Sequence, residues 1–111
     1  MSLLINNASG TAANTGGNGL ILPNRDPVFV QNNLLTTLYF WATTWGGAAV
    51  QLYISPQLRN SILPPVWFPY NPLVTENGFF TFQHRWGQMK VEVSGATANT
   101  AGLYVSLFSG L

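Results

Sequence analysis

The side chains that could carry acid–base chemistry are few and separated along the chain. There is one histidine, His84, and there are three carboxylates, Asp26, Glu76 and Glu92. Asp26 lies in a proline-bounded turn, Glu76 precedes an Asn-Gly pair, and Glu92 alternates with Lys90 on a predicted strand, and these are placements typical of structural residues. Catalysis needs several such groups to converge in defined roles. The sequence therefore predicts that the chain is not an enzyme.

Metal and nucleic-acid binding have equally little support. With one histidine and no cysteine, a zinc site would need carboxylates from unrelated turns, and no acidic loop resembles a calcium site. The four basic residues are scattered, whereas nucleic-acid binding draws most of its affinity from clustered Lys and Arg. We expect no metal, no cofactor and no nucleic-acid partner.

Aromatic side chains are the remaining candidates for a functional role. Two functions are open to them: a stacking platform for sugar rings, or packing in the core and at subunit contacts. Carbohydrate sites usually combine aromatic rings with carboxylates and amides, and acids are scarce here, so we favour packing and keep carbohydrate binding as the alternative. The candidate interface residues are Trp41, Trp45, Trp67, Phe68 and Tyr70.

The composition indicates a protein whose surface is largely covered by other protein molecules. The 111 residues suit one domain, and 47% of them are hydrophobic while only 6% are charged. Independent soluble domains carry about a quarter charged residues. The first residues lack the pattern of a secretion signal, and no apolar run approaches the ~20 residues of a membrane helix. We expect a product made in the cytoplasm, with no membrane partner.

Period-two alternation predicts the fold class. Val50, Leu52 and Ile54 would share one face of a strand, and the segments "MKVEV" and "LYVSLF" alternate in the same way. Further strands are predicted over residues 28–31 and 35–43, where apolar residues occupy both faces of the second half. No apolar stripe has the 3.6-residue period of a helix. We predict an all-β protein, a small antiparallel β-sandwich or jelly roll with negligible helix.

Two turn signals and one proline-rich segment divide the strands. Gly46-Gly47 and Asn77-Gly78 each predict a hairpin. Residues 56–72 contain four prolines after the first residue, which predicts a stiff loop rather than a helix or a central strand.

The first part of the chain is expected to be an arm. Residues 1–27 include the uncharged, aperiodic stretch "NNASGTAANTGGNG", which predicts a flexible extended segment that contributes no core positions. Such a segment could be a frayed terminus or could lie in a groove on a neighbour. Residues 28–111 would form the single β-sandwich domain.

The order of these motifs resembles that of small virion proteins of tailed bacteriophages. The resemblance extends over about residues 40–108 and rests on "WGGAAVQLYISP", a loop with Trp67, "GFFTF", "VEVSGAT" and a final "LYV". It points to the head decoration, or cement, type of β-sandwich protein. The proline-rich loop and the segment "MKVEVSG" depart from the family pattern at surface positions, which affects the expected partner more than the fold.

The resemblance implies a function without catalytic residues. A decoration protein would bind the major capsid protein and copies of itself, most simply as a homotrimer, and stabilise the head lattice on the capsid surface through apolar and main-chain contacts. A tail- or fibre-associated module, or a carbohydrate-binding module that uses exposed aromatics, is the alternative.

Overall fold

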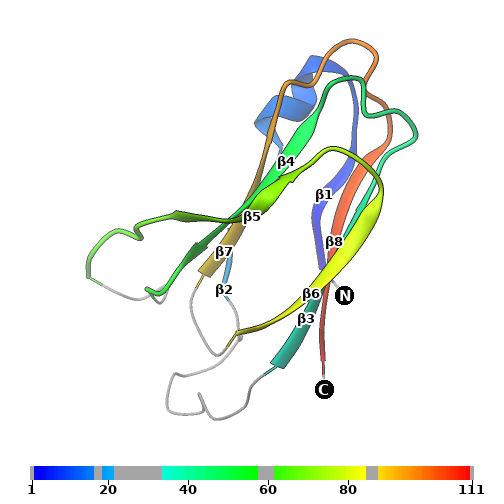
Figure 1. Ribbon diagram of the computed structural model, residues 1–111. Coiled ribbons are helices and arrows are strands. Elements are labelled where there is room, and N and C mark those ends of the chain that lie inside the picture. Colours follow the sequence, from blue (N-terminus) through cyan, green and yellow to red (C-terminus); the bar gives the residue numbers. More distant parts are fainter. Residues whose placement is uncertain (1, 17–18, 22–33, 58–61, 85–87, 111) are drawn as a thin grey trace.

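The chain folds into two four-stranded antiparallel sheets (Figure 1). The computed structural model describes residues 2–16, 19–21, 34–57, 62–84 and 88–110. The first sheet has the order β1-β8-β3-β6, and its strands are β1 Ser2–Ala8, β8 Leu103–Gly110, β3 Leu34–Trp41 and β6 Gly78–His84. The second sheet has the order β2-β7-β4-β5, and its strands are β2 Gly19–Ile21, β7 Gln88–Ser94, β4 Ala49–Ser55 and β5 Phe68–Val74.

The strand order is that of a jelly roll. Strands pair as β4 with β5, β3 with β6, β2 with β7 and β1 with β8, so each pair encloses the previous one along the chain. The pairs alternate between the two sheets, as happens when one long antiparallel ribbon is rolled up. The all-β prediction is confirmed, and the topology selects the jelly roll among small antiparallel sandwiches.

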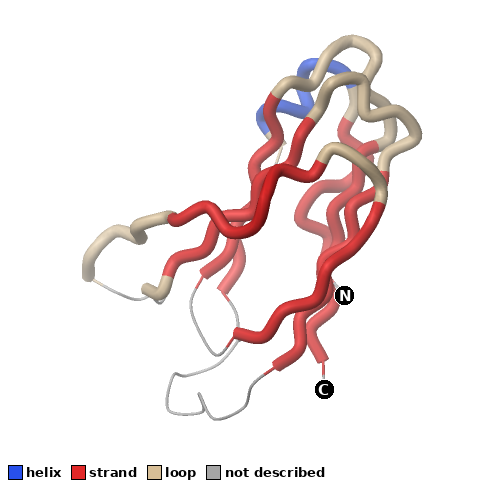
Figure 2. Tube along the Cα trace, viewed as in Figure 1, coloured by secondary structure: helices blue, strands red, loops and turns tan. Residues whose placement is uncertain are grey.

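The core lies between the sheets and follows the predicted alternation. Figure 2 shows the two layers of strands close together near the end that carries the helix and diverging toward the other end. The predicted inward positions of β4, β7 and β8 are buried or packed against the core: Val50, Leu52, Ile54, Met89, Val91, Val93, Leu103, Val105 and Leu107. From β3, Leu38 and Phe40 join them.

Neither predicted hairpin forms. Gly46-Gly47 does reverse the chain, but β3 before it belongs to the first sheet and β4 after it to the second. The turn before Gly78 likewise connects β5 to β6 across the sheets. Both turns therefore carry the chain from one sheet to the other, because a turn signal predicts a reversal but does not specify the partner strand.

The proline-rich segment is only partly a loop. Its last five residues, 68–72, begin β5, which contains Pro69 and Pro72 and pairs with β4 on one side, with a register shift between Val50 and Leu52. Proline lacks the N–H of a sheet ladder and is tolerated on an edge strand. Phe68 and Tyr70 therefore lie on an edge strand instead of in the predicted loop.

The expectation that the N-terminal segment adds nothing to the core is wrong. Residues 2–8 form β1, which pairs with β8, and Leu4 and Ile5 are almost fully buried. Ala13 belongs to the core as well, in a short 3-10 helix, η1, Gly10–Thr15, that was not predicted. The strand predicted over residues 28–31 and the boundary after residue 27 lie outside the described residues.

Side-chain and backbone hydrogen bonds hold η1 against the loop between β7 and β8. The Asn14 amide accepts a bond from the Ala96 N–H at 2.9 Å and donates one to the Ala96 carbonyl at 3.2 Å. The Gly10 N–H donates to the Thr100 carbonyl at 2.8 Å.

Within the described part of the chain, no helix has the length and apolar character needed to span a membrane.

Leu4→Ala should show how far the fold depends on β1. The substitution leaves a cavity in the core and should lower the free energy of unfolding by about 3 kcal/mol. Leu3→Ala is the matched control, because Leu3 is 44% exposed on the opposite face of the same strand, and it should cost about 0.5 kcal/mol. Denaturant unfolding measures both, and equal small losses would show that β1 is dispensable.

Gly46→Ala tests the turn that joins β3 to β4. Gly46 has a φ of +57°, and a Cβ there would lie 2.6 Å from the Thr100 nitrogen. We expect a loss of about 2 kcal/mol or more from backbone strain and the clash. Gly78→Ala is the control, since its Cβ would meet nothing within 4 Å, and it should leave stability nearly unchanged. A Gly46 variant as stable as the Gly78 variant would contradict the turn geometry.

Candidate functional site

The outer face of the first sheet carries a group of exposed aromatic side chains. Trp41 is 50% exposed, Phe79 is 66% exposed, and Tyr39 and Phe108 are more than two-fifths exposed. They come from β3, β6 and β8. Leu3 of β1, the strand that pairs with β8, is exposed as well. We call the outward residues Leu3, Tyr39, Trp41, Phe79, Tyr104 and Phe108 the aromatic face.

Ring contacts order the aromatic face. Tyr39 lies at its centre, with ring centroids 5.6 Å from Phe79 and 5.4 Å from Phe108 in an edge-to-face arrangement. Trp41 and Tyr104 form a second pair with centroids 5.9 Å apart. Such contacts limit rotamer freedom before a partner arrives, so less side-chain entropy is lost on binding.

The aromatic face carries no charge among the described residues. The positions between the rings hold hydroxyl groups, and the Thr37 and Thr81 hydroxyls lie 2.9 Å apart in a hydrogen bond across β3 and β6. Ser106 occupies the register position beside Tyr39 on β8. A partner could cover this surface without removing any charge from water, which is the costly step in burying a polar surface.

The second sheet presents a different outer face. Lys90 and Glu92 on β7 form an ion pair of 2.9 Å. The Lys90 ammonium also lies 5.5 Å from the Tyr53 ring centroid and 4.8 Å from that of Trp67. The charge is therefore balanced within the chain itself, and one face of the Trp67 ring is occupied by a cation.

The five candidate interface residues are not brought together. Trp41 belongs to the aromatic face, whereas Trp67 lies against Lys90 on the second sheet. Phe68 is 52% exposed on the β5 edge, and Tyr70 packs partly against the core. Trp45 is half-buried near the loops, where its indole N–H donates to the Asn77 side-chain oxygen at 2.9 Å.

Five members of the aromatic face, Leu3, Tyr39, Phe79, Tyr104 and Phe108, are not among the candidates that the sequence indicated. Tyr39 shares the outward parity of Trp41, and apolar residues on both faces of this strand are typical of a strand that is covered on both sides or lies at a subunit contact. Phe79 and Phe108 lie at outward positions of their strands, whereas the alternation of those strands predicts only which residues face the core. The signal that could have found them was the large apolar residue at an outward position of an alternating strand.

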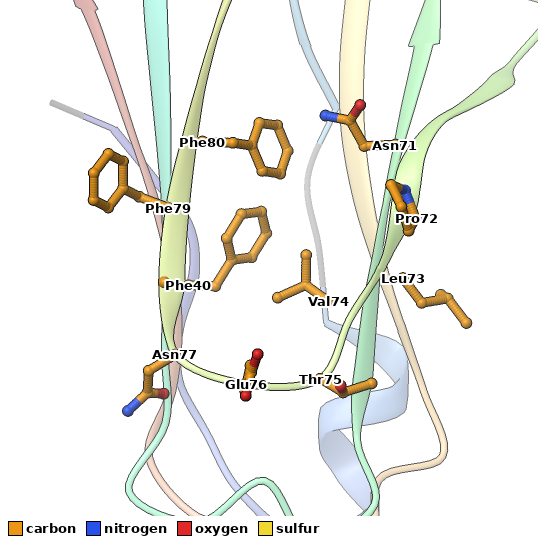
Figure 3. A pocket seen from close by; sticks show the side chains of 11 residues that line it. Phe40, Asn71, Pro72, Leu73, Val74, Thr75, Glu76, Asn77, Phe79 and Phe80 are labelled. Carbon is orange, nitrogen blue, oxygen red and sulfur yellow. The ribbon is translucent and has the colours of Figure 1, made fainter.

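A cleft of about 450 Å³ opens between the edge strands β5 and β6 (Figure 3). Phe40, Phe80 and Val74 project into it, while Phe79 and Leu73 point away. The Phe40 and Phe80 rings lie 5.3 Å apart and form an apolar wall.

Polar groups surround the mouth of this cleft. Asn71, Thr75, Glu76 and Asn77 contribute to its lining. Asn71 has a φ of +68°, which is uncommon for a residue with a side chain. The Asn77 oxygen accepts hydrogen bonds from the Trp45 indole and from the Ala42 N–H, both at 2.9 Å.

The titratable residues do not form a cluster in the described structure. Glu76 is exposed at the cleft and Glu92 is paired with Lys90. His84 ends β6, and Asp26 lies outside the described residues. No group of three or more His, Cys, Asp or Glu side chains that could hold a metal ion occurs among the residues described.

Comparison with known proteins places the chain in no family. No protein-family model matches its sequence, and no curated protein matches it.

Asn77→Ala should loosen the loops at this end of the cleft. It leaves the Ala42 N–H and the Trp45 indole N–H without their acceptor, which should cost about 1–2 kcal/mol of stability. Asn77→Asp keeps an oxygen at the same place and should retain most of it. Thermal or denaturant unfolding checks both, and an equal loss in the two variants would show that the acceptor oxygen is not what matters.

Proposed function

We propose that the chain is a structural virion protein of a tailed bacteriophage, a capsid decoration protein that binds the head lattice through the aromatic face. The observation that carries this proposal is an ordered, uncharged aromatic surface across a whole sheet of a jelly roll. Aromatic residues are enriched and charged residues depleted at the centres of protein interfaces.

The architecture supports the same proposal. Double-sheet jelly rolls are the fold of many viral capsid proteins. A chain with 6% charged residues is suited to a surface that is covered in its working state. The partners proposed are the major capsid protein and further copies of the chain on the capsid surface.

Residues that carry the family resemblance also meet in the structure. The Thr97 hydroxyl of "SGAT" donates to the Gly46 carbonyl of "WGG" at 2.6 Å. A Cβ on Gly95 would lie 2.6 Å from the Gly47 carbonyl oxygen, so the two segments touch through their backbones. Two of the motifs on which the resemblance rests are therefore packed against each other.

A carbohydrate-binding module is the second candidate, and the cleft favours it. Phe80, Asn71 and Glu76 place an aromatic ring, an amide and a carboxylate around one opening. Trp67, one of the aromatic residues that could have formed a platform for sugar rings, has one ring face occupied by Lys90. In this case, binding on a glycan array should be lost in Glu76→Gln.

Attachment to particles tests the proposed function. Mass spectrometry of gradient-purified particles from the source of the chain should detect it in many copies. Particles that lack the protein should rebind the purified chain, and Tyr39→Lys should weaken that binding roughly 30-fold, as expected for a central interface residue worth about 2 kcal/mol.

Ser94→Lys is the matched control, since it adds the same charge at an exposed position on the second sheet. It should bind like the wild type, and thermal unfolding should show that both variants remain folded. Equal weakening in the two variants would remove the aromatic face from the proposal. A chain absent from purified particles, with glycan binding that depends on Glu76, would replace it with the second candidate.

A further inference from the structure

Among the described residues the sandwich has four edge strands, and they differ in how they are protected from pairing with another chain. Edge strands offer unpaired backbone groups, and proteins usually protect them with prolines, bulges or shortness. β5 contains Pro69 and Pro72, and β2 has only three residues. The pairing of β1 with β8 shifts register twice, and Asn7 has a φ of +53°.

β6 has none of these protections. Its seven residues, "GFFTFQH", contain no proline and no Lys, Arg, Asp or Glu. It pairs with β3 over seven successive positions without a register shift, from Gly78 opposite Phe40 to His84 opposite Leu34. It is also the last strand of its sheet among the described residues. A regular, uncharged, aromatic edge is the kind that adds a further strand.

The cleft provides a second reason for a strand to be added here. The opening between β5 and β6 is lined by the partly buried side chains of Phe80 and Val74 and by Phe40, which is buried in the core. A strand placed along β6 would extend the first sheet past this opening and bring side chains over it. Backbone hydrogen bonds and apolar burial would then act at the same edge.

We propose that β6 is the edge through which two copies of the chain associate, with β6 of one copy antiparallel to β6 of the other. A second copy suits this edge because the segment carries no formal charge to repel itself, and an antiparallel contact of identical strands has two-fold symmetry. The proposal goes beyond attachment through the aromatic face, because it concerns the edge of the sheet.

The register that pairs all seven residues follows from symmetry. Thr81 is the middle residue of Gly78–His84, so it would lie opposite Thr81 of the second copy. Residues on the outer face of one copy would then continue into those of the other. The two aromatic faces would join in one eight-stranded sheet, with Phe79 near the seam.

Introducing a charge at Thr81 tests the contact. The wild type should sediment at twice the 12.1 kDa mass of the chain, which distinguishes a dimer from the trimer that the resemblance implies. Thr81→Lys and Thr81→Glu should each sediment as monomers, because like charges would face each other across the two-fold axis. An equimolar mixture of the two variants should recover the dimer.

Thr37→Lys is the matched control, because Thr37 lies opposite Thr81 on the neighbouring inner strand β3 and on the same face. It should stay dimeric if the contact is at the edge. Hydrogen exchange should also show that alternate amides of residues 78–84, those that point away from β3, lose protection on dilution, while the amides of β3 do not.

Three results would overturn the β6 contact. They are a wild-type monomer at every concentration, a Thr37→Lys variant that dissociates as readily as Thr81→Lys, or a charge mixture that stays monomeric. The rebinding experiment with Tyr39→Lys measures particle attachment separately, so failure of the β6 contact and failure of the proposed attachment site can be distinguished.

Discussion

The packing of two crossing loops against each other is the constraint on which the sandwich depends. Because the chain passes between sheets at almost every connection, the loops must satisfy their own backbone groups where no ladder continues. Thr100 is buried, and its hydroxyl donates to the Trp45 carbonyl at 2.9 Å while it accepts from the Thr97 N–H at 3.0 Å. The Thr44 and Ala101 backbones exchange two further hydrogen bonds. Only a glycine at position 46 lets the chain come this close.

This arrangement explains which parts of the fold could be predicted. The inward residues of β4, β7 and β8 alternate without interruption, so the sequence indicated them directly. Strand partners could not be predicted in the same way, since Gly46-Gly47 reverses the chain equally well within a sheet or between sheets. The nesting of strand pairs depends on contacts distant in sequence, which no local pattern contains.

The N-terminal segment was misjudged for a related reason. The pairing of β1 with β8 shifts register between Leu3 and Ile5 and again before Ala8, so the neighbours Leu4 and Ile5 are both buried. Bulges of this kind break period-two alternation. Asn and Ser residues then look like an unstructured arm, although Asn14 hydrogen-bonds to both backbone groups of Ala96. Small polar residues here form structure through side-chain hydrogen bonds that composition does not predict.

The two outer faces divide the functional possibilities of the molecule. In the second sheet, the Lys90 charge is paired within the chain. The outer face of the first sheet exposes aromatic rings that contact one another and carries no charge among the described residues.

The four most exposed aromatic residues of the aromatic face present roughly 400 Å², which at about 25 cal/mol per Å² represents some 10 kcal/mol if fully buried. Association costs an estimated 4–15 kcal/mol before any contact is counted. The aromatic face alone would therefore bind a single partner weakly. Firm attachment requires that several copies act together, and a paired edge that joins two aromatic faces in one rigid surface would supply that multivalency.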